Sequence, residues 1–318
     1  MNDELEFTVI SDIHYYSKKN FVDGFDKNKK PKPGQLFFSR SEEIVEHTFD
    51  CLCENDTPDI VLISGDRTYN GERTSHDEMK AALKKLQQKG KRVYVITATH
   101  DYTTPRMPTY GIDKNDKYIE VESVKRTQLL KYYGDFGYNN AIAKHKSTMS
   151  YVAQLADGYR LFALNDDYGD PDCGFSDELM NWVKTEANNA KRDGQYIIAM
   201  THHPLVPPSP IYTAVAKGDM LNDYELRSKQ LSDLGFDFVL TGHTHMHNIS
   251  YCKIGNKKFY DISTAALTGF PPYYRQIVLN KEQKKAEIKT ICADCADSID
   301  TNGLALEEYT KDLFFGVV

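Results

Sequence analysis

Five short apolar segments of this chain end just before side chains that can bind a metal ion. The segments are 7–10, 61–64, 93–96, 196–200 and 236–240. The metal-binding side chains that follow four of them are Asp12, His14, Asp66, His202, His243 and His245. Carboxylates combined with imidazoles suit Mn, Fe, Zn or Ni rather than Ca or Mg alone. The repeated pattern therefore predicts one shared site for divalent metal ions.

Two neighbouring metal ions need a ligand that both can share. Asp66 follows Gly65 directly, and a lone carboxylate on a tight glycine turn can bridge two metals. The remaining segment, 93–96, is followed by Thr99, His100 and Asp101. These polar residues are expected to face the same site.

The elements around these residues indicate a layered α/β fold. Residues 59–64 form a continuous apolar run, which is typical of a strand buried on both faces. Predicted helices over 39–54, with Ser41 as a cap, and 75–90, opened by a Ser75 capping box, flank that strand. Strand–helix–strand units place the carboxyl ends of parallel strands at one edge of the sheet, where sites form.

The rest of the chain continues this alternation and then turns to hairpins. Further helices are expected over 121–133, 177–191, 223–234 and 304–315. Further strands are expected over 150–155, 160–164, 251–254, 258–261, 276–279 and 286–291. A mobile basic loop (17–35) and a long loop (102–120) are expected to form much of the pocket wall. We expect one domain, 1–318, with 296–318 as a peripheral helical extension.

Composition limits the partners. The chain has 318 residues and a formal net charge of −7, which argues against a nucleic-acid backbone as the main partner. An acidic protein can still act on phosphate esters when bound metals supply positive charge. No run of about 18 apolar residues occurs, so no membrane span is expected. The start, Met1 to Glu4, has no signal-peptide pattern, which predicts the cytoplasm, or export or surface anchoring if a leader has been removed.

The cysteine pattern leaves two interpretations open. Six cysteines are present, and only Cys292 and Cys295 have C-x-x-C spacing. Reduced structural thiols are the first interpretation. A disulfide between Cys292 and Cys295 is the second.

In order along the chain, the polar groups resemble the motifs of the calcineurin-like metallophosphoesterase superfamily. The matching blocks are D-x-H (Asp12, His14), G-D (Gly65, Asp66), a variant of N-H-D (Thr99, His100, Asp101), H-H (His202, His203) and G-H-x-H (Gly242, His243, His245). They span about three quarters of the chain. The chain looks most similar to the bacterial branch that includes cyclic-nucleotide phosphodiesterase-like members. The resemblance implies a four-layer α/β/β/α sandwich.

The resemblance also implies roles for these residues. One metal would be held by Asp12, His14, Asp66 and His245, and a second would share Asp66 and add His202 and His243. Water or hydroxide between the metals would attack phosphorus in a phosphomonoester or phosphodiester. The expected catalytic residues are His100, which would steady the phosphoryl charge or protonate the leaving alkoxide, and Asp101, which would orient His100. The substrate would be a phosphorylated small molecule or a nucleotide-type compound.

The chain departs from the family pattern at two positions. Thr99 stands where the family has an asparagine ligand of the second metal, and a hydroxyl is a poorer neutral ligand than a carboxamide. Arg67 stands where the family usually has an apolar residue, so it is expected either near the phosphate or in solvent. The alternative function is therefore a degenerate member with a weakened second site that binds a phosphorylated ligand with little turnover.

Other polar residues have simpler interpretations. We expect His203 to support a ligand from behind, His247 to lie at the rim, and Asn70 to shape its turn. His47, His76 and His145 are expected to face solvent.

Overall fold

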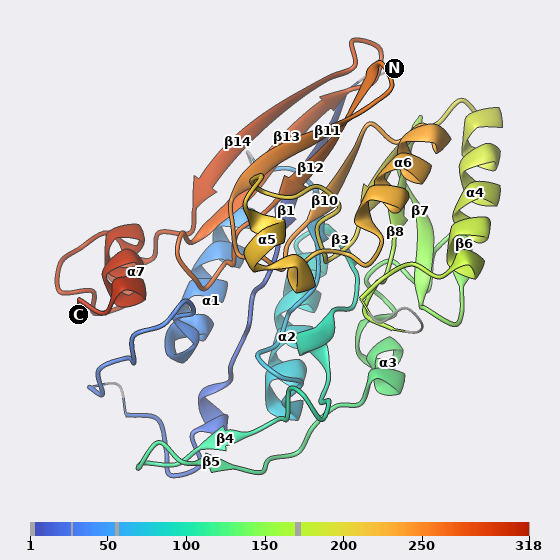
Figure 1. Ribbon diagram of the computed structural model, residues 1–318. Coiled ribbons are helices and arrows are strands. Elements are labelled where there is room, and N and C mark those ends of the chain that lie inside the picture. Colours follow the sequence, from blue (N-terminus) through green and yellow to red (C-terminus); the bar gives the residue numbers. More distant parts are fainter. Residues whose placement is uncertain (1–3, 27, 55–56, 169–172, 318) are drawn as a thin grey trace.

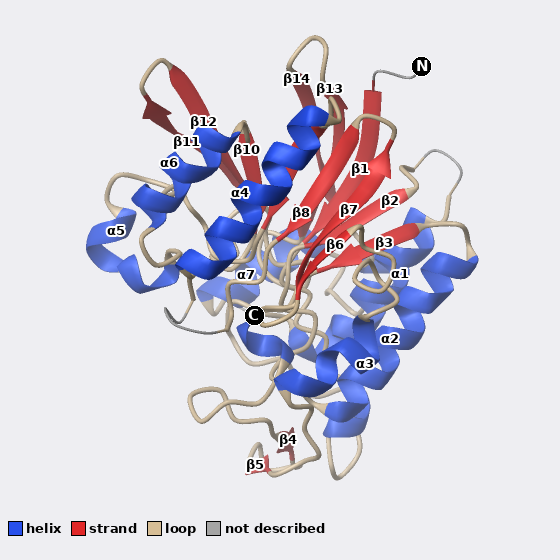
Figure 2. Cartoon of the chain, turned by 90° about the vertical axis from the view of Figure 1, so that its right-hand side faces the viewer, coloured by secondary structure: helices blue, strands red, loops and turns tan. Residues whose placement is uncertain are grey.

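Two β-sheets face each other at the centre of the structure, and helices cover the outer face of each sheet (Figure 1). The computed structural model describes residues 4–26, 28–54, 57–168 and 173–317. Figure 2 shows the strands between two groups of helices. This arrangement is the expected four-layer α/β/β/α sandwich.

The first sheet carries three of the metal-binding segments. Its strands, in spatial order, are β14 (Lys285–Cys292), β13 (Tyr273–Asn280), β1 (Glu4–Ile10), β2 (Ile60–Ile63) and β3 (Arg92–Val95). Strands β1, β2 and β3 are parallel, whereas β13 is antiparallel to both of its neighbours. The helices on its outer side are α1 (Ser41–Leu52), α2 (Arg73–Gln88), α3 (Leu129–Tyr133) and α7 (Leu306–Phe315).

The second sheet carries the other two segments. Its strands, in spatial order, are β11 (Asn248–Ile254), β12 (Lys257–Ser263), β10 (Phe238–Thr241), β9 (Tyr196–Met200), β8 (Tyr159–Ala163), β7 (Ser150–Ala156) and β6 (Ala143–His145). The four central strands, β12, β10, β9 and β8, are parallel. Its outer face is covered by α4 (Asp177–Arg192) and α6 (Tyr224–Leu234).

The smaller elements connect these layers. They are the short helix α5 (Tyr212–Val215), the hairpin β4 (Gly111–Ile112) and β5 (Tyr118–Ile119), and the 3-10 turns η1 (Lys18–Asn20), η2 (Phe38–Arg40), η3 (Thr99–Asp101), η4 (Arg126–Gln128), η5 (Lys217–Asp219) and η6 (Ala296–Ser298). The hairpin lies inside 102–120, which was expected to be a loop. It projects below the sandwich (Figure 2).

Strand side chains alternate between the layers because successive residues point to opposite faces. In β2, Val61 and Ile63 pack against the helices, while Ile60 and Leu62 pack between the sheets. All four are buried. This double burial explains why the segment is apolar at every position.

Two expected helix caps are wrong. Helix α1 begins at Ser41 itself, and the Ser41 hydroxyl accepts a hydrogen bond from the Tyr16 backbone (2.9 Å). Helix α2 begins at Arg73, and the Ser75 hydroxyl accepts from the Ser17 backbone (3.1 Å). Both hydroxyls therefore fasten the chain after β1 to the helix starts.

The expected helix over 121–133 is also largely wrong. Only residues 129–133 are α-helical. Upstream, the Val124 backbone donates to Gly71 (2.8 Å), and the Arg73 backbone donates to Glu122 (2.9 Å). This pairing holds residues 122–124 extended against the chain after Asp66, so tertiary contacts override local helix propensity.

The C-terminal segment contributes to the core. Leu306, Tyr309 and Leu313 of α7 are buried in the cluster beneath the first sheet, where the Tyr309 ring meets Phe37. The one-domain organisation stays a prediction.

All six cysteines are free thiols. Among the described helices, none has the length and apolar character to cross a membrane.

Candidate metal centre

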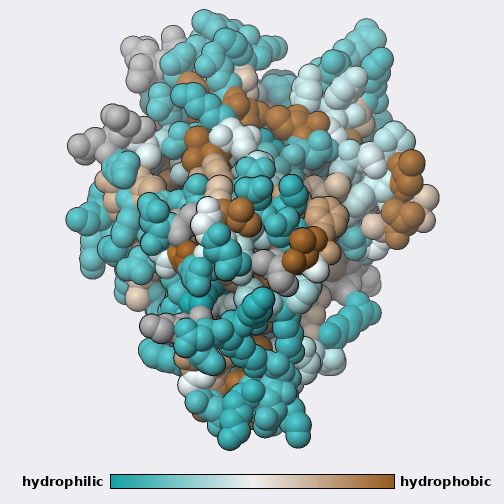
Figure 3. Space-filling view, turned by 90° about the vertical axis from the view of Figure 1, so that its left-hand side faces the viewer, coloured by the Kyte–Doolittle hydropathy of each residue, from teal (hydrophilic) through white to brown (hydrophobic). Residues whose placement is uncertain are grey.

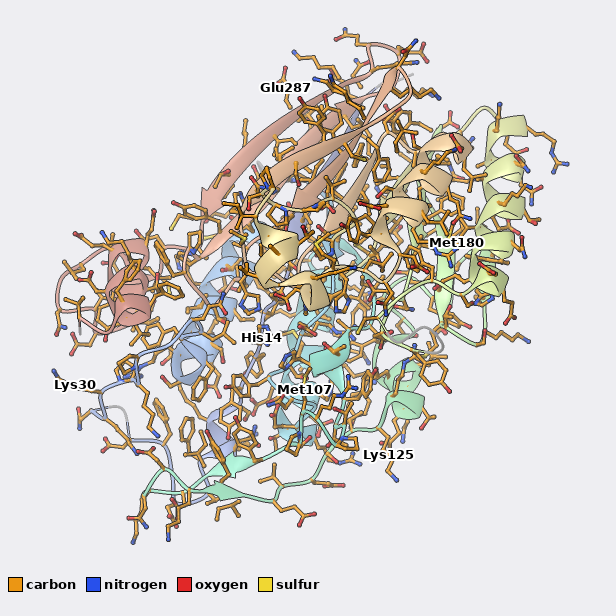
Figure 4. All side chains as sticks on the ribbon, in the orientation of Figure 1. His14, Lys30, Met107, Lys125, Met180 and Glu287 are labelled. Carbon is orange, nitrogen blue, oxygen red and sulfur yellow. The ribbon has the colours of Figure 1, made fainter. Side chains whose placement is uncertain are left out.

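The six expected metal ligands meet at the carboxyl edge of the parallel strands. Asp12, His14 and His245 form one group, and Asp66, His202 and His243 form a second. In each group the three ligand atoms lie within 4.8 Å of one another. Figure 4 labels His14 near the middle of the molecule, below the strands.

The Asp66 carboxylate faces both groups. Its Oδ2 atom lies 3.1 Å from His202 Nε2 and 3.8 Å from His14 Nε2. Asp12 Oδ1 similarly lies 3.4 Å from His245 Nε2 and 4.0 Å from His202 Nε2. The two groups are therefore neighbours, and each of the two carboxylates lies within 4.0 Å of histidines in both.

Five of the six ligands have a left-handed backbone, which non-glycine residues rarely adopt. The φ angles are 48° at Asp12, 44° at His14, 49° at Asp66, 64° at His243 and 56° at His245. Such conformations cost about 1–3 kcal/mol each and persist where the surroundings impose them. Here His14 and Asp12 donate backbone hydrogen bonds to the Asp66 and Gly65 carbonyls (3.0 and 3.3 Å).

Two glycines let the ligand loops approach each other. Gly65 has φ +102°, and a Cβ atom there would lie 2.6 Å from Ala98 Cβ and 2.7 Å from His202 Nδ1. A Cβ atom on Gly242 would overlap the Ser11 hydroxyl and the Asp12 carboxylate. Both positions exclude any side chain.

Electrostatics keep the carboxylates ionised despite burial. Burial would raise the pKa of Asp12, but hydrogen bonding to His14 and the charge of His202 lower it well below its usual value. Burial would likewise raise the pKa of Asp66, but the charges of His202 and His100 lower it well below its usual value. Burial lowers the pKa of His14 to about 4, against the opposing effect of Asp12. Anionic carboxylates and a neutral imidazole are the forms that bind metals.

Buried polar atoms without partners support cation binding. The Thr99 hydroxyl is buried and lacks a hydrogen-bond partner among the described residues. His202 Nδ1 lies 2.8 Å from the Ser64 carbonyl, so Nε2 of the neutral ring and Asp66 Oδ2, 3.1 Å apart, face each other as two acceptors. His14 Nε2 and His245 Nε2 lie 3.0 Å apart, with the Asp12 carboxylate beside them. Divalent cations would satisfy these atoms, so the donor set fits the expected metals.

The comparison with protein families identifies this constellation. The sequence profile described as calcineurin-like phosphoesterase matches residues 5–247, which is more than half of the chain. The chain belongs to this family. Curated proteins provide no significant match to the sequence.

Solved structures of similar fold include two hydrolases. A dimetal phosphatase from Danio rerio shares 12% identity with this phosphoesterase, at a TM-score of 0.57, covering 91% of this chain and 99% of that one. A sulfate thiohydrolase from Thermus thermophilus shares 10% identity at a TM-score of 0.48, covering 98% of this chain and 60% of that one. At 12% identity, the likeness to the dimetal phosphatase concerns the fold.

His100 lies beside the metal centre with its ring orientation determined. Its Nδ1 atom is 2.7 Å from the Tyr69 carbonyl and 2.8 Å from Asn70 Oδ1. Because both partners are acceptors, Nδ1 carries a proton and Nε2 remains for other chemistry. The ring makes an edge contact with His14 (centroids 4.9 Å apart), and the His100 backbone donates to Asp66 Oδ1 (2.9 Å).

The Asp101 carboxylate does not contact the His100 ring, contrary to the expected side-chain interaction. The Asp101 carboxylate accepts hydrogen bonds from the Arg67 backbone and guanidinium (2.8 Å each) and from the Ala98 backbone (3.0 Å). Asn70, expected only to shape a turn, contacts His100 instead. Arg67 is completely buried and paired with Asp101, so it does not lie in solvent.

A further acidic residue of this phosphoesterase, Asp166, was missed. Its Oδ2 atom accepts from the backbones of His202 (3.2 Å) and His203 (2.7 Å), and Oδ1 lies 3.2 Å from His203 Nδ1. Burial would lower the pKa of His203, but Asp166 raises it to about 10. The charged His203 ring packs on His243 (centroids 4.0 Å apart), as its supporting position requires. Asp166 follows the predicted strand 160–164, so the rule that found the ligands would have found it.

Two histidines expected in solvent are buried. His76 hydrogen-bonds the Tyr133 hydroxyl (2.6 Å) and the Asp101 carbonyl (2.9 Å) because it lies on the same face of α2 as the buried Met79 and Leu83. His145 bonds the Thr148 hydroxyl (2.9 Å). His47 is half-buried on α1, and His247 is half-buried at the rim, where it contacts the Thr290 hydroxyl (3.0 Å).

Proposed function

We propose that this chain hydrolyses phosphate esters, either monoesters or diesters, at a two-metal centre. Asp12, His14 and His245 would hold one metal, His202 and His243 the other, and Asp66 both. The observation that carries the proposal is the Asp66 carboxylate facing both groups of ligand atoms. Mn, Fe, Zn and Ni suit this donor set.

The metals supply Lewis acidity and lower the pKa of bound water. The chain's own residues supply alignment and charge. The left-handed turns at Asp12 and Asp66 aim their carboxylates at the centre. His203, charged beside Asp166, supports the His243 ring from behind.

His100 would act on the ester oxygens. Nδ1 is fixed as a donor by Tyr69 and Asn70, so a proton on Nε2 can be given to the leaving alkoxide or held against a phosphoryl oxygen. The ring is only half-buried, which leaves it accessible to a substrate. A phosphorylated small molecule or nucleotide-type compound would fit this mode of attack.

Chelation and substitution of Asp66 test the proposal. We expect the protein, supplied with Mn, to hydrolyse a generic aryl phosphomonoester or phosphodiester, and EDTA to abolish the rate. Asp66→Ala should lose both bound metals and turnover. Asp193→Ala, which removes an exposed carboxylate paired with Arg160, should behave as the parent. Full activity in Asp66→Ala would refute the assignment.

A further inference from the structure

A cavity of about 450 Å³ lies between the chain that follows β1 and the β4–β5 hairpin. Seven aromatic residues contribute to its wall: Phe21, Phe25, Phe37, Phe38, Tyr69, Tyr110 and Tyr118. Lysines also line it, among them Lys30 and Lys114. We call it the aromatic–lysine pocket. Its volume lies within the range of about 300–1,000 Å³ that small-molecule sites occupy.

The two sides of the pocket are fastened to each other. The Val22 backbone donates to the Ile112 carbonyl (3.0 Å), and Lys29 Nζ lies 2.6 Å from Asp116 Oδ1. On the hairpin, the Tyr110 and Tyr118 rings lie 4.1 Å apart. The aromatic wall is therefore formed by packing within the chain itself.

Tyr69 joins the pocket to the metal centre. Its ring packs against Phe38 (4.9 Å) and Tyr110 (6.1 Å) on the pocket side and makes an edge contact with His14 (6.3 Å). Its carbonyl accepts from the His100 ring. Tyr69 is therefore shared by the wall of the pocket and the surroundings of the metal centre.

Four lysines (Lys29, Lys30, Lys32, Lys114) and three aspartates (Asp26, Asp113, Asp116) line the pocket, so its net charge is slightly positive. Lys29 and Lys32 both pair with Asp116, whereas the ammonium groups of Lys30 and Lys114 have no ion pair within the described residues. Figure 4 labels Lys30 on the outer side of the loop region. In Figure 3 the lower part of the molecule is mainly hydrophilic, with apolar side chains visible only in small areas.

We propose that the aromatic–lysine pocket binds the leaving group of the substrate, and that this group carries a planar aromatic ring and a negative charge. The inference rests on the proposed function. Aromatic walls stack on planar rings, and unpaired lysines at the rim favour an anion. The position beside Tyr69 makes this pocket the place where esters are distinguished from one another.

The test compares esters whose leaving groups are all primary alkoxides, so that intrinsic reactivity is matched. Glycerol 3-phosphate has no ring, 2-phenylethyl phosphate has a simple ring, and adenosine 5′-monophosphate has a nucleobase. A para carboxylate on 2-phenylethyl phosphate adds the negative charge. Each is offered as the monoester and as its methyl diester, with Mn present. We expect kcat/KM to be about fivefold or more higher for ring-bearing esters, the factor that stacking of one ring provides.

Variants at the pocket then test whether the preference for ring-bearing esters arises there. Tyr118 is 69% exposed, so Tyr118→Ala should fold, lose the ring preference and keep the glycerol ester within twofold. Tyr118→Phe keeps the ring and should retain the preference. Lys30→Gln should remove only the increase in kcat/KM that the para carboxylate of the substrate provides. Tyr251→Ala, at an exposed tyrosine on β11, and Lys84→Gln, on α2, are the matched controls.

The outcomes separate the two proposals. Absence of chelator-sensitive hydrolysis of every ester refutes the proposed function. Hydrolysis without a ring preference, or equal losses in Tyr118→Ala and Tyr251→Ala, refutes only the pocket assignment. Preference for the adenosine ester alone identifies a nucleobase as the ring. Equal preference for the adenosine and 2-phenylethyl esters identifies a general aromatic site.

Discussion

Arg67 and Asp101 form a completely buried ion pair directly behind the metal centre. The guanidinium Nη2 atom lies 2.8 Å from Asp101 Oδ2, and the Arg67 Cζ atom lies 3.8 Å from the Tyr133 ring centroid. Asp101 ends the turn η3, which carries Thr99 and His100. The pair therefore connects the chain after Asp66 to the turn that positions His100.

A double-mutant cycle should show that the two charges depend on each other. Arg67→Met or Asp101→Asn alone leaves a buried group without its partner, at a cost of about 3–5 kcal/mol in unfolding free energy. The double variant should cost less than the sum of the two. Urea unfolding of the four proteins measures this, and additive costs would contradict it.

Asn70 should matter for turnover more than for stability. Asn70→Ala removes the side-chain acceptor of His100 Nδ1 while the Tyr69 carbonyl remains. We expect kcat to fall about 10- to 100-fold, as for other residues that orient a functional histidine. Metal content should not change.

The double variant checks that Asn70 acts through His100. Adding Asn70→Ala to His100→Ala should lower kcat no further, because the oriented ring is already absent. If the losses in kcat of the two single variants multiply in the double variant, Asn70 acts through another group.

Gly242 should be required for metal binding. A methyl group in Gly242→Ala meets the Ser11 hydroxyl and the Asp12 carboxylate, which forces the ligand away. We expect loss of the metal held by Asp12 and destabilisation of about 1–3 kcal/mol, typical of overpacking. Metal analysis and thermal unfolding report the two effects. Gly218→Ala, where an added Cβ has open space, is the control.

The metal ligands could be predicted from sequence because one geometric rule places them. Parallel strands of one sheet end at one edge, so the polar residues just beyond 7–10 and 61–64 were expected to lie together. The contact of Asp66 with His202 depends in addition on how the second sheet packs against the first. This rule needs strand positions to within about two residues, an accuracy that buried apolar runs provide.

The partners of Asp101 could not be predicted because side-chain direction in a short turn decides them. Asp101 and His100 are adjacent in sequence, yet their side chains contact Arg67 and Asn70 respectively. The burial of His76, in contrast, was missed although the sequence indicates it. His76 lies seven residues before Leu83, on the same face of α2 as the buried Met79 and Leu83, so the helical period itself would have placed it inside.

We expect Thr99 to determine whether the second metal site fills, and therefore whether turnover is efficient or low. Its buried hydroxyl has no hydrogen-bond partner among the described residues, and His100, the next residue, donates to Asp66. We expect Thr99→Val to lower the content of the second metal, and Thr99→Asn to raise its affinity, since a carboxamide oxygen is a better ligand. Metal content per chain and kcat measure both.

The parent protein provides the decisive comparison for Thr99. Two bound metals and a robust rate in the parent would eliminate the low-turnover alternative. Near-zero parent activity that Thr99→Asn raises strongly, with a second metal gained, would establish it.

Glu72 should make the stability of the protein depend on pH. Burial raises the pKa of its carboxyl to about 7, against backbone hydrogen bonds that include one from Asn70 (3.1 Å). The folded state therefore retains a proton between the usual pKa, 4.5, and about pH 7, where the unfolded state has released it. Stability attributable to Glu72 should fall as pH rises through this window, by roughly 3 kcal/mol at about 1.4 kcal/mol per pKa unit.

Glu72→Gln should remove that part of the pH dependence. A glutamine still accepts the Asn70 backbone hydrogen bond but does not ionise, so the variant should become more stable relative to the parent as pH rises from 5 to 8. Urea unfolding of the metal-free proteins across this range measures the difference. Glu46→Gln, at an exposed glutamate on α1, is the control and should follow the parent. A constant difference between Glu72→Gln and the parent across the range would show that Glu72 is ionised in the folded protein throughout.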